Sequence, residues 1–333
     1  MPSADQIKAL LLSHAQGDDA QFYAIAMQIA AGEARGGHGK VAQEIRALID
    51  KAKSRPAAIS AAPIPLTRPR GELADLLGVR YPDTRLSDLI LSKSLAARLA
   101  RVVREHKSIG QIRQHGLSPR RKLLLAGSPG TGKTLSAAAL AGELGLPLFT
   151  VRLDSLFTKF MGETAAKLRL IFDALHQTRA VYLFDEFDSI GSHRTQANDV
   201  GEMRRVVNSF LQMVEQDSSD SLIIAATNHI GLLDRALFRR FDDIIEFELP
   251  DQEHIKLLLK TRLAGFLPKQ IRWSELTKLS AGLSYGDLTM AAENAMKTAL
   301  IEGRKAITNA DLSQAIRERR ASMHEQGVEL NAT

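Results

Sequence analysis

The sequence predicts an α/β fold built on a parallel, doubly wound sheet, preceded by a small helical module and followed by an all-helical domain. From residue 83, strand-like apolar runs alternate with helix-length segments, an alternation typical of a parallel sheet with crossover helices. After Pro250 these runs stop, and helical periodicity continues alone through 252–319. The strand-like runs lie at 122–126, 148–153, 180–184, 222–227 and 244–248.

The N-terminal part of the chain predicts a tethered helical module. Residues 4–53 have the pattern of three short helices, and the stretch 55–71 holds four of the chain's eleven prolines among many alanines. This composition favours an extended linker. We therefore expect a helical N-terminal module at 1–53, a linker at 54–82, the α/β domain at 83–250, a helical domain at 251–320 and a mobile tail at 321–333.

Composition excludes several classes of protein and site. The 333 residues include no cysteine, which excludes disulfides, thiolate metal sites and cysteine nucleophiles. No apolar run reaches the roughly 18 residues that a bilayer span requires. The N-terminus also lacks the basic-then-apolar pattern of a secretion signal. We therefore expect a cytoplasmic protein with no membrane partner.

Positive charge is concentrated ahead of the first predicted buried strand. Residues 53–122, here called the basic belt, hold fifteen Lys or Arg against five Asp or Glu, in a chain of net charge +6. Such a belt is compatible with nucleic-acid binding, with a subunit contact or with a solvated surface. Its one aromatic residue is Tyr81, so stacking on bases has little support. Nucleic acid is therefore the less favoured partner.

The segment Gly127–Thr134 carries the strongest chemical signal. It fits the pattern G-x-x-x-x-G-K-[ST] and lies between the run 122–126 and a helix-forming run that begins at Leu135. This is the context of a phosphate-binding loop, because glycines let backbone N–H groups approach phosphate oxygens at a helix N-terminus. Lys133 would reach the outer phosphates, and the Thr134 hydroxyl would ligate magnesium. The flanking runs disfavour the alternative, an ordinary glycine-rich turn.

Two adjacent carboxylates are the second indication of a nucleotide-hydrolysing site. Asp185 and Glu186 follow the buried run 180–184, and so they lie at the carboxyl edge of the sheet with the phosphate loop. Asp185 would hold magnesium, and Glu186 would act as general base on an attacking water. The alternative is a strand that merely ends in acidic residues. The spacing of 51 residues from Thr134 to Asp185 favours the catalytic interpretation.

Two further polar segments follow the fourth strand-like run. Asn228 ends that run and could orient the attacking water or sense a γ-phosphate, although asparagine is also a common turn former. Arg239 and Arg240 precede the last strand and suit γ-phosphate charge, including in trans across a subunit boundary. The alternative for the two arginines is an ion pair with Asp242 or Asp243.

Taken in order, the motifs Gly-Ser-Pro-Gly-Thr-Gly-Lys-Thr, Phe-Asp-Glu-Phe-Asp, Ala-Thr-Asn and Arg-Arg-Phe-Asp resemble the AAA+ ATPases, closest to their AAA clade. The resemblance covers about 83–319 and implies a P-loop NTPase αβα sandwich with a five-stranded parallel sheet, then an all-helical lid. It implies ATP and Mg²⁺ as cofactors, ATP hydrolysis, and a homo-oligomeric ring, usually hexameric, with ATP between neighbours. Asn228 then takes the sensor-1 position. Arg239 and Arg240 take the place of the trans-acting fingers, and their adjacency leaves open which one acts.

Two local features resemble parts of protein-remodelling members of this clade. Lys159, Phe160, Met161 and Gly162 resemble the pore loop that grips an extended polypeptide, whereas the alternative puts Phe160 and Met161 in a core. Gly286 lies at a helix start that resembles the lid segment packing on adenine. The residues expected to bind the nucleotide are therefore Gly127, Ser128, Pro129, Gly130, Thr131, Gly132, Lys133, Thr134, Leu135 and Gly286, with Thr134 and Asp185 as magnesium ligands.

The favoured function is an ATP-hydrolysing ring that remodels, unfolds or disassembles protein substrates and threads them past the Phe160 loop. The N-terminal module loosely resembles the small helical leaders of bacterial AAA ATPases that accompany a subtilisin-like protease. That resemblance implies a separate protease or adaptor as a partner of residues 1–53, since the chain has no His-Glu-x-x-His zinc motif. The competing hypotheses are a DNA-associated ATPase or loader that uses the basic belt, and a scaffold whose ring only presents the N-terminal helices.

Overall fold

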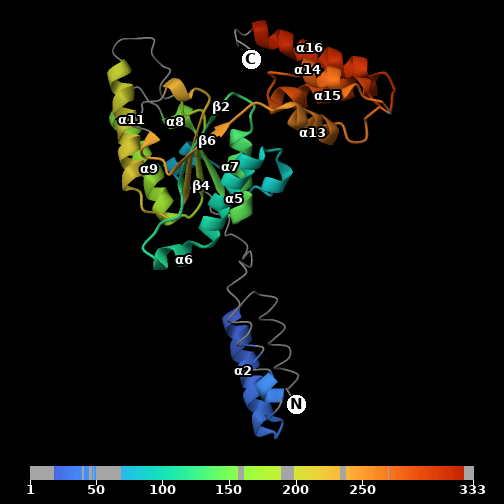
Figure 1. The fold of residues 1–333 in the computed structure, drawn as a ribbon. Coiled ribbons are helices and arrows are strands. Elements are labelled where there is room, and N and C mark those ends of the chain that lie inside the picture. The colour runs from blue at the N-terminus through green and yellow to red at the C-terminus, as the bar shows by residue number, and fades with distance from the viewer. Residues whose placement is uncertain are drawn as a thin grey trace. The chain divides into compact units, whose positions relative to one another are not determined.

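The computed structural model describes residues 19–39, 41–44, 47, 49, 69–156, 161–188, 199–232, 238–268 and 270–325. The chain divides into two compact units, Met1–Leu66 and Thr67–Thr333 (Figure 1). The first unit contains helix α2 (Asp19–Arg35). Gly37 follows this helix with a φ of +87°, as is common where a helix ends. The second unit contains the sheet and all the predicted site residues.

The second unit is built around a six-stranded sheet in the order β1-β3-β4-β5-β2-β6. Strands β2 to β6 pair in parallel, whereas β1 runs antiparallel to β3. Each of the predicted strand-like runs forms a strand, and the prediction of an αβα fold with a parallel sheet is confirmed. The strands are β1 (Leu77–Arg80), β2 (Lys122–Gly127), β3 (Leu148–Val151), β4 (Val181–Phe184), β5 (Leu222–Thr227) and β6 (Asp243–Phe247).

Strand β1 is a sixth strand that the sequence prediction of five did not include. It follows the short helix α4 (Glu72–Leu76), and both lie in the segment 54–82 that was expected to be linker. Leu76 and Leu77 are buried in the core beneath one face of the sheet. Burial of these leucines favours an edge strand here. Its sequence Leu-Gly-Val-Arg contains a glycine and ends in an arginine, so it lacks the continuous apolar run that marked the other strands.

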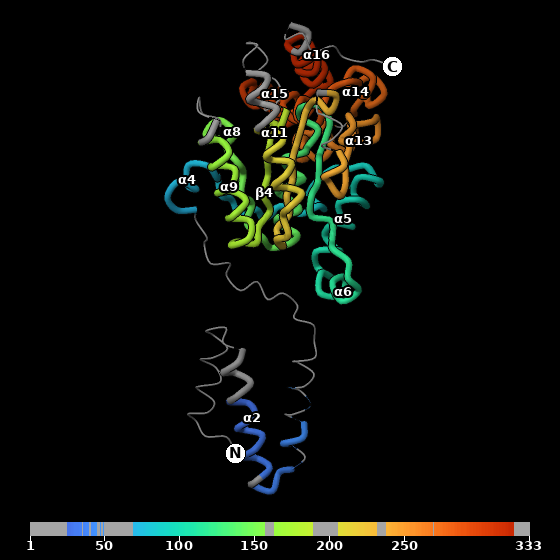
Figure 2. The backbone as a smooth tube through the Cα atoms, turned by 90° about the vertical axis from the view of Figure 1, so that its left-hand side faces the viewer, coloured from blue at the N-terminus to red at the C-terminus, as the bar shows by residue number. Residues whose placement is uncertain are grey.

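Helices cover both faces of the sheet, because successive strand residues point to opposite sides. Leu123 and Leu125 of β2 pack with α5 and α7, whereas Leu124 between them packs with α9 and α11. Figure 2 looks onto the side of α9 and α11. The four covering helices are α5 (Lys93–Lys107), α7 (Lys133–Leu144), α9 (Met161–Gln177) and α11 (Asp199–Gln216), and the shorter segments are η1 (Leu86–Asp88), α6 (Ile109–Gln114), α8 (Leu153–Leu156) and η2 (Ile230–Leu232).

After β6 the described chain is helical, as predicted. Its helices form the lid and have an apolar core of their own, in which Leu288, Ala292 and Ile316 are fully buried. The last helix continues past the boundary expected at residue 320. The lid helices are α13 (Gln252–Arg262), α14 (Trp273–Leu279), α15 (Tyr285–Ile301) and α16 (Asn309–Glu325). In the described part of the chain, no helix is both long and apolar enough to cross a membrane.

The parallel register brings the carboxyl ends of three strands together. Ala126 of β2 pairs with Thr227 of β5, and Phe184 of β4 pairs with Ala225 of β5. Each of these residues lies within two positions of the end of its strand. The phosphate loop, the two acidic residues and Asn228 therefore begin at one edge of the sheet, where ligands bind in open α/β folds.

Candidate nucleotide-binding site

The segment predicted as a phosphate loop connects β2 to α7. Gly130 and Gly132 have φ angles of +74° and +100°, a backbone region that favours glycine. Gly127 needs glycine for a different reason, because a Cβ there would lie 2.2 Å from the carbonyl oxygen of Phe247 at the end of β6. The loop backbone is therefore held close to the sheet, in a conformation that can present N–H groups to an anion.

Lys133 opens α7 and is only 7 % exposed. Its Nζ donates to two carbonyl oxygens of the phosphate loop, at 2.6 and 3.0 Å, and to Oδ1 of Asn228 at 2.9 Å. Burial lowers the pKa of Lys133, while the charges of Asp185 and Asp188 raise it. A buried ammonium group held by neutral acceptors favours a nearby anion, because phosphate oxygens would replace its lost hydration with charged hydrogen bonds.

Thr134 and Asp185 meet across the end of the sheet. Thr134 Oγ1 donates to Asp185 Oδ2 at 2.7 Å. Hydroxyl and carboxylate oxygens suit Mg²⁺, which usually takes one or two protein oxygens together with phosphate and water. Within the described ranges, no group of three or more His, Cys, Asp or Glu could enclose a metal. The pair therefore fits a Mg²⁺ shared with a bound phosphate better than a metal enclosed by protein ligands alone.

Glu186 follows Asp185 in a strained turn. Among the described residues it is the one non-glycine residue with a positive φ, at +50°. Such backbone costs about 1–2 kcal/mol in a non-glycine residue, and strain of this kind is concentrated at functional sites. The Glu186 N–H donates to Asp185 Oδ1 at 3.0 Å. The turn leaves Glu186 exposed and Asp185 half-buried, so the two carboxylates face different surroundings.

Most of the predicted site residues line one hollow. Its lining includes the phosphate loop from Pro129 through Leu135, both acidic residues, Asn228 and Gly286. Gly127 and Ser128 are not part of this lining but supply the two carbonyl oxygens that bind Lys133. The hollow thus joins residues from the ends of β2, β4 and β5 with the first turn of α15.

The same hollow contains residues that sequence reasoning missed. They come from the segment ahead of α5 and from two lid helices. No motif marks them, although the resemblance around Gly286 pointed to the start of α15. Their apolar members suit a flat aromatic base. The missed residues are Asp88, Leu89, Ile90, Leu91, Leu258, Thr261, Arg262, Tyr285, Thr289 and Met290.

The lid touches the phosphate loop backbone to backbone. The N–H of Gly286 donates to the carbonyl oxygen of Gly130 at 3.0 Å. A Cβ on Gly130 would lie 2.4 Å from Oγ of Ser284, and a Cβ on Gly286 would lie 3.3 Å from Cα of Gly130. Both glycines therefore allow an approach that larger residues would hinder.

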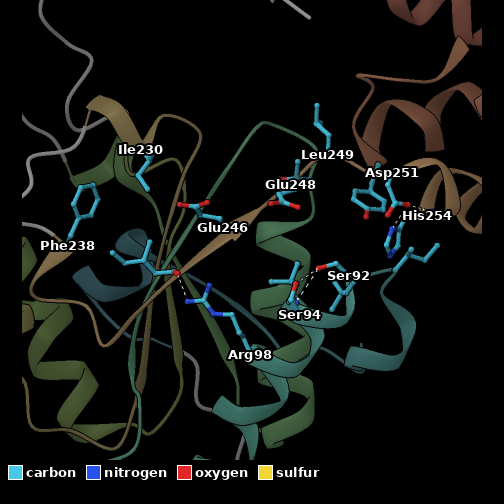
Figure 3. Close-up of a pocket in the computed structure, with 16 residues that line it drawn as sticks. Ser92, Ser94, Arg98, Ile230, Phe238, Glu246, Glu248, Leu249, Asp251 and His254 are labelled. Atoms are coloured by element: carbon cyan, nitrogen blue, oxygen red, sulfur yellow. Dashed lines mark hydrogen bonds and ion pairs between the residues drawn. The ribbon is translucent and has the colours of Figure 1, made fainter. Parts of the chain in front are cut away.

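A second hollow, drawn in Figure 3, adjoins the first and shares four lining residues with it: Ile90, Leu91, Thr131 and Tyr285. The start of α5, the strand β6 and the start of α13 surround it. Arg98 there donates to the carbonyl oxygen of Ile244 at 2.6 Å, which covers part of the free edge of the sheet. Of the predicted site residues, this hollow contains only Thr131, and it extends the nucleotide hollow toward β6 and the start of α13.

The two arginines lie before β6, outside the hollow that holds the phosphate loop. Arg240 Nε donates to Oε2 of Glu215 at 3.1 Å, whereas Arg239 is exposed. The alternative interpretation expected an acidic partner in Asp242 or Asp243. An acidic partner is present for Arg240, but it is Glu215 on α11, far from these residues in the sequence.

The predicted pore loop lies only partly within the described residues. Lys159 and Phe160 lie outside them, and Met161 and Gly162 are the first two residues of α9. The assignment of these four residues to a substrate-gripping loop therefore stays a prediction.

Comparison with known proteins identifies the family. Residues 123–249 match the family described as ATPase family associated with various cellular activities (AAA). An uncharacterized AAA family ATPase from Sinorhizobium fredii is 33 % identical over 318 residues, which cover 96 % of each chain. The chain belongs to the AAA family of ATPases.

Two other relatives are longer proteins whose names state an activity. The ATP-dependent zinc metalloprotease FtsH 3 of Sphaerobacter thermophilus is 33 % identical over 255 residues, 74 % of this chain and 52 % of that protein. A proteasome-activating nucleotidase of Methanoregula boonei is 36 % identical over 212 residues, 61 % of this chain and 48 % of that protein. This AAA chain thus spans about half the length of each.

The close contact at Gly130 makes a prediction for this AAA ATPase. Gly130→Ala is expected to weaken nucleotide binding roughly tenfold or more, because the added Cβ conflicts with both the positive φ and Ser284. Titration of the full chain with a fluorescent ATP analogue measures the effect. Gly116→Ala is the matched control, since Gly116 has a φ of +71° but no heavy atom within 4 Å of an added Cβ. Equal affinity in the two variants would contradict a required loop–lid contact.

Proposed function

We propose that this AAA ATPase hydrolyses Mg²⁺-ATP between neighbouring copies in a homo-oligomeric, hexameric ring and uses the energy to remodel protein substrates. The observation that carries the proposal is the hollow in which the phosphate loop, Asp185, Glu186 and Asn228 converge. The names of two relatives, an ATP-dependent zinc metalloprotease and a proteasome-activating nucleotidase, support protein as the class of substrate.

The proposed roles follow from the contacts of each residue. The loop N–H groups and Lys133 bind the phosphates, and Thr134 with Asp185 would hold Mg²⁺, which supplies charge neutralisation at the phosphate oxygens. Glu186, exposed on its strained turn, accepts a proton from the attacking water. Asn228 orients this water, and its 2.9 Å contact with Lys133 links it to the phosphate-binding cation.

We assign the trans-acting role to Arg239 and not to Arg240. The guanidinium of Arg240 already binds Glu215 on α11 of its own chain, so its reach toward a neighbour is restricted. Arg239 is exposed, and its side chain makes no ion pair or hydrogen bond with any described residue. An exposed guanidinium suits the γ-phosphate charge of an adjacent subunit.

The competing DNA-associated function is less favoured, because five of the fifteen cations in the basic belt are paired within the chain. Five of its cations make ion pairs with acidic residues, which reduces the charge available to neutralise phosphates. A steep dependence of DNA affinity on salt concentration would revive this function. The pairs are Arg98–Asp243, Lys107–Glu143, Arg113–Asp220, Arg120–Glu105 and Arg121–Asp217.

Residues 1–53 are proposed to bind a separate protease or adaptor. The first compact unit ends at Leu66, and the described part of residues 1–53 is helical apart from the turn at 36–38, which suits a tethered recognition module. The FtsH relative is named a zinc metalloprotease, whereas this chain lacks the His-Glu-x-x-His motif.

Glu186→Gln is expected to bind ATP with nearly unchanged affinity and to lower kcat roughly 100-fold or more, because the base is lost while the phosphate and magnesium contacts remain. Phosphate release measures kcat, and titration with labelled ATP measures Kd. Glu293→Gln, an exposed carboxylate on α15, is the matched control and should keep both values. Turnover near that of the natural chain in Glu186→Gln would exclude Glu186 as the base.

Arg239→Ala is expected to lower ATP turnover on the order of 10³-fold, and Arg240→Ala much less. Mixing Arg239→Ala chains with Lys133→Ala chains should restore part of the activity, because some sites in a mixed ring then combine one intact half from each chain. A greater loss in Arg240→Ala would reverse the assignment. Absence of recovery on mixing would argue against a shared site.

Phe160→Ala, introduced into the Glu186→Gln chain, is expected to reduce retention of an unfolded protein about tenfold in the presence of ATP, because the aromatic ring supplies the grip. Casein is a suitable probe, and a pull-down with the tagged chain measures its retention. Phe160→Tyr keeps the ring and is the control. If casein is retained equally without the ring, the threading proposal is wrong.

A further inference from the structure

Three side chains connect the last helix of the lid to the phosphate loop. Arg319 Nε on α16 donates to Asp287 Oδ1 on α15 at 2.7 Å. The second oxygen of Asp287 accepts hydrogen bonds from Oγ and N–H of Ser284, at 2.6 and 3.1 Å. Ser284 itself lies so close to Gly130 that a Cβ there would come within 2.4 Å of its Oγ.

Asp287 and Ser284 fix the geometry of the turn that touches the loop. They form a capping box, in which each side chain accepts a hydrogen bond from the backbone N–H of the other residue. This box sets the direction in which α15 begins, and the turn it holds presents the N–H of Gly286 to the carbonyl oxygen of Gly130. The position of Asp287 therefore affects a backbone contact of the phosphate loop.

The carboxylate of Asp287 depends on a cation from another helix. Its side chain is 6 % exposed, and that of Arg319 is 32 % exposed. Helix α15 contains no arginine, and its one lysine, Lys297, lies in the second half of the helix. Within the described ranges, Asp287 forms its ion pair with Arg319. Removing one partner of a buried ion pair leaves an uncompensated charge, which distorts the structure that holds it.

We propose that Arg319 is a positioning residue for the nucleotide site. By holding Asp287, it fixes the first turn of α15 against Gly130 and raises the affinity of the phosphate loop for nucleotide. Arg319 is not part of the lining of the nucleotide hollow, so it acts through Asp287 and Ser284. The inference rests on the proposed nucleotide binding by residues 127–134.

The neighbouring residue Arg320 provides a matched control. It also extends from α16 to another part of the lid, where it donates to the carbonyl oxygens of Leu279 and Ala281 at 3.4 and 3.1 Å. These bonds hold α16 to the end of α14 and to Ala281, three residues before Ser284, and neither of them involves Ser284 or Asp287. Arg320→Gln therefore tests whether any loss of lid packing affects the nucleotide site.

The experiment compares Arg319→Gln, Arg319→Lys and Arg320→Gln in the full chain. Titration with a fluorescent ADP analogue gives Kd, ATP turnover gives KM and kcat, and thermal unfolding gives Tm. Arg319→Gln is expected to raise Kd and KM about five- to tenfold, with kcat changed less than about twofold. Arg319→Lys should recover most of the affinity, because an ammonium can still pair with Asp287. Arg320→Gln should keep Kd within about twofold, even where its Tm falls.

Two results would overturn the inference. An unchanged Kd in Arg319→Gln would mean that Asp287 holds its position without the cation. Equal rises in Kd for Arg319→Gln and Arg320→Gln at equal loss of Tm would mean a general effect of lid stability. Lys133→Ala separates this inference from the proposed function. If the natural chain binds the ADP analogue no better than Lys133→Ala, the nucleotide site itself is wrong.

Discussion

The parallel register of β4, β5 and β2 is the constraint on which the candidate site depends. It aligns three strand ends, and as a result Thr134 lies 2.7 Å from Asp185 and Lys133 lies 2.9 Å from Asn228. A shift of one residue in any of these strands would turn its side chains to the opposite face and separate these pairs. The two helical layers hold the register, because each covers the apolar residues of one face.

The lid completes the site through its backbone. Gly130 and Gly286 meet without side chains between them, and their contact at 3.0 Å makes the phosphate loop sensitive to the position of α15. That position depends in turn on the capping box at Ser284 and on the pair between Asp287 and Arg319. A nucleotide bound in the hollow would therefore contact residues of both the α/β domain and the lid, each of which has its own core. A change in the bound nucleotide could then move the lid relative to the α/β domain.

The sequence predicted the structural features that depend on residues close together in the chain. Continuous apolar runs marked the five parallel strands, because strands buried on both faces lack polar alternation. The glycine pattern marked the phosphate loop, because positive φ and close approach restrict residue choice locally. Strand β1 was missed because its sequence Leu-Gly-Val-Arg offers no continuous apolar run. The part of the hollow formed by Asp88–Leu91 and α13 was also missed, because no local pattern distinguishes its residues from an ordinary turn and helix.

By itself, the sequence determined the five parallel strands, the order of the motifs and the chemical groups available at each strand end. Only the tertiary structure decided which groups meet, such as Lys133 with Asn228 across 95 residues and Asp287 with Arg319 from another helix. It also paired Arg240 with Glu215, which left Arg239 as the exposed arginine of the two. The physical reason is the distance along the chain over which each kind of interaction acts. Periodicity and backbone preference act over a few residues, whereas side-chain contacts between elements depend on strand order and on the packing of both helical layers and the lid.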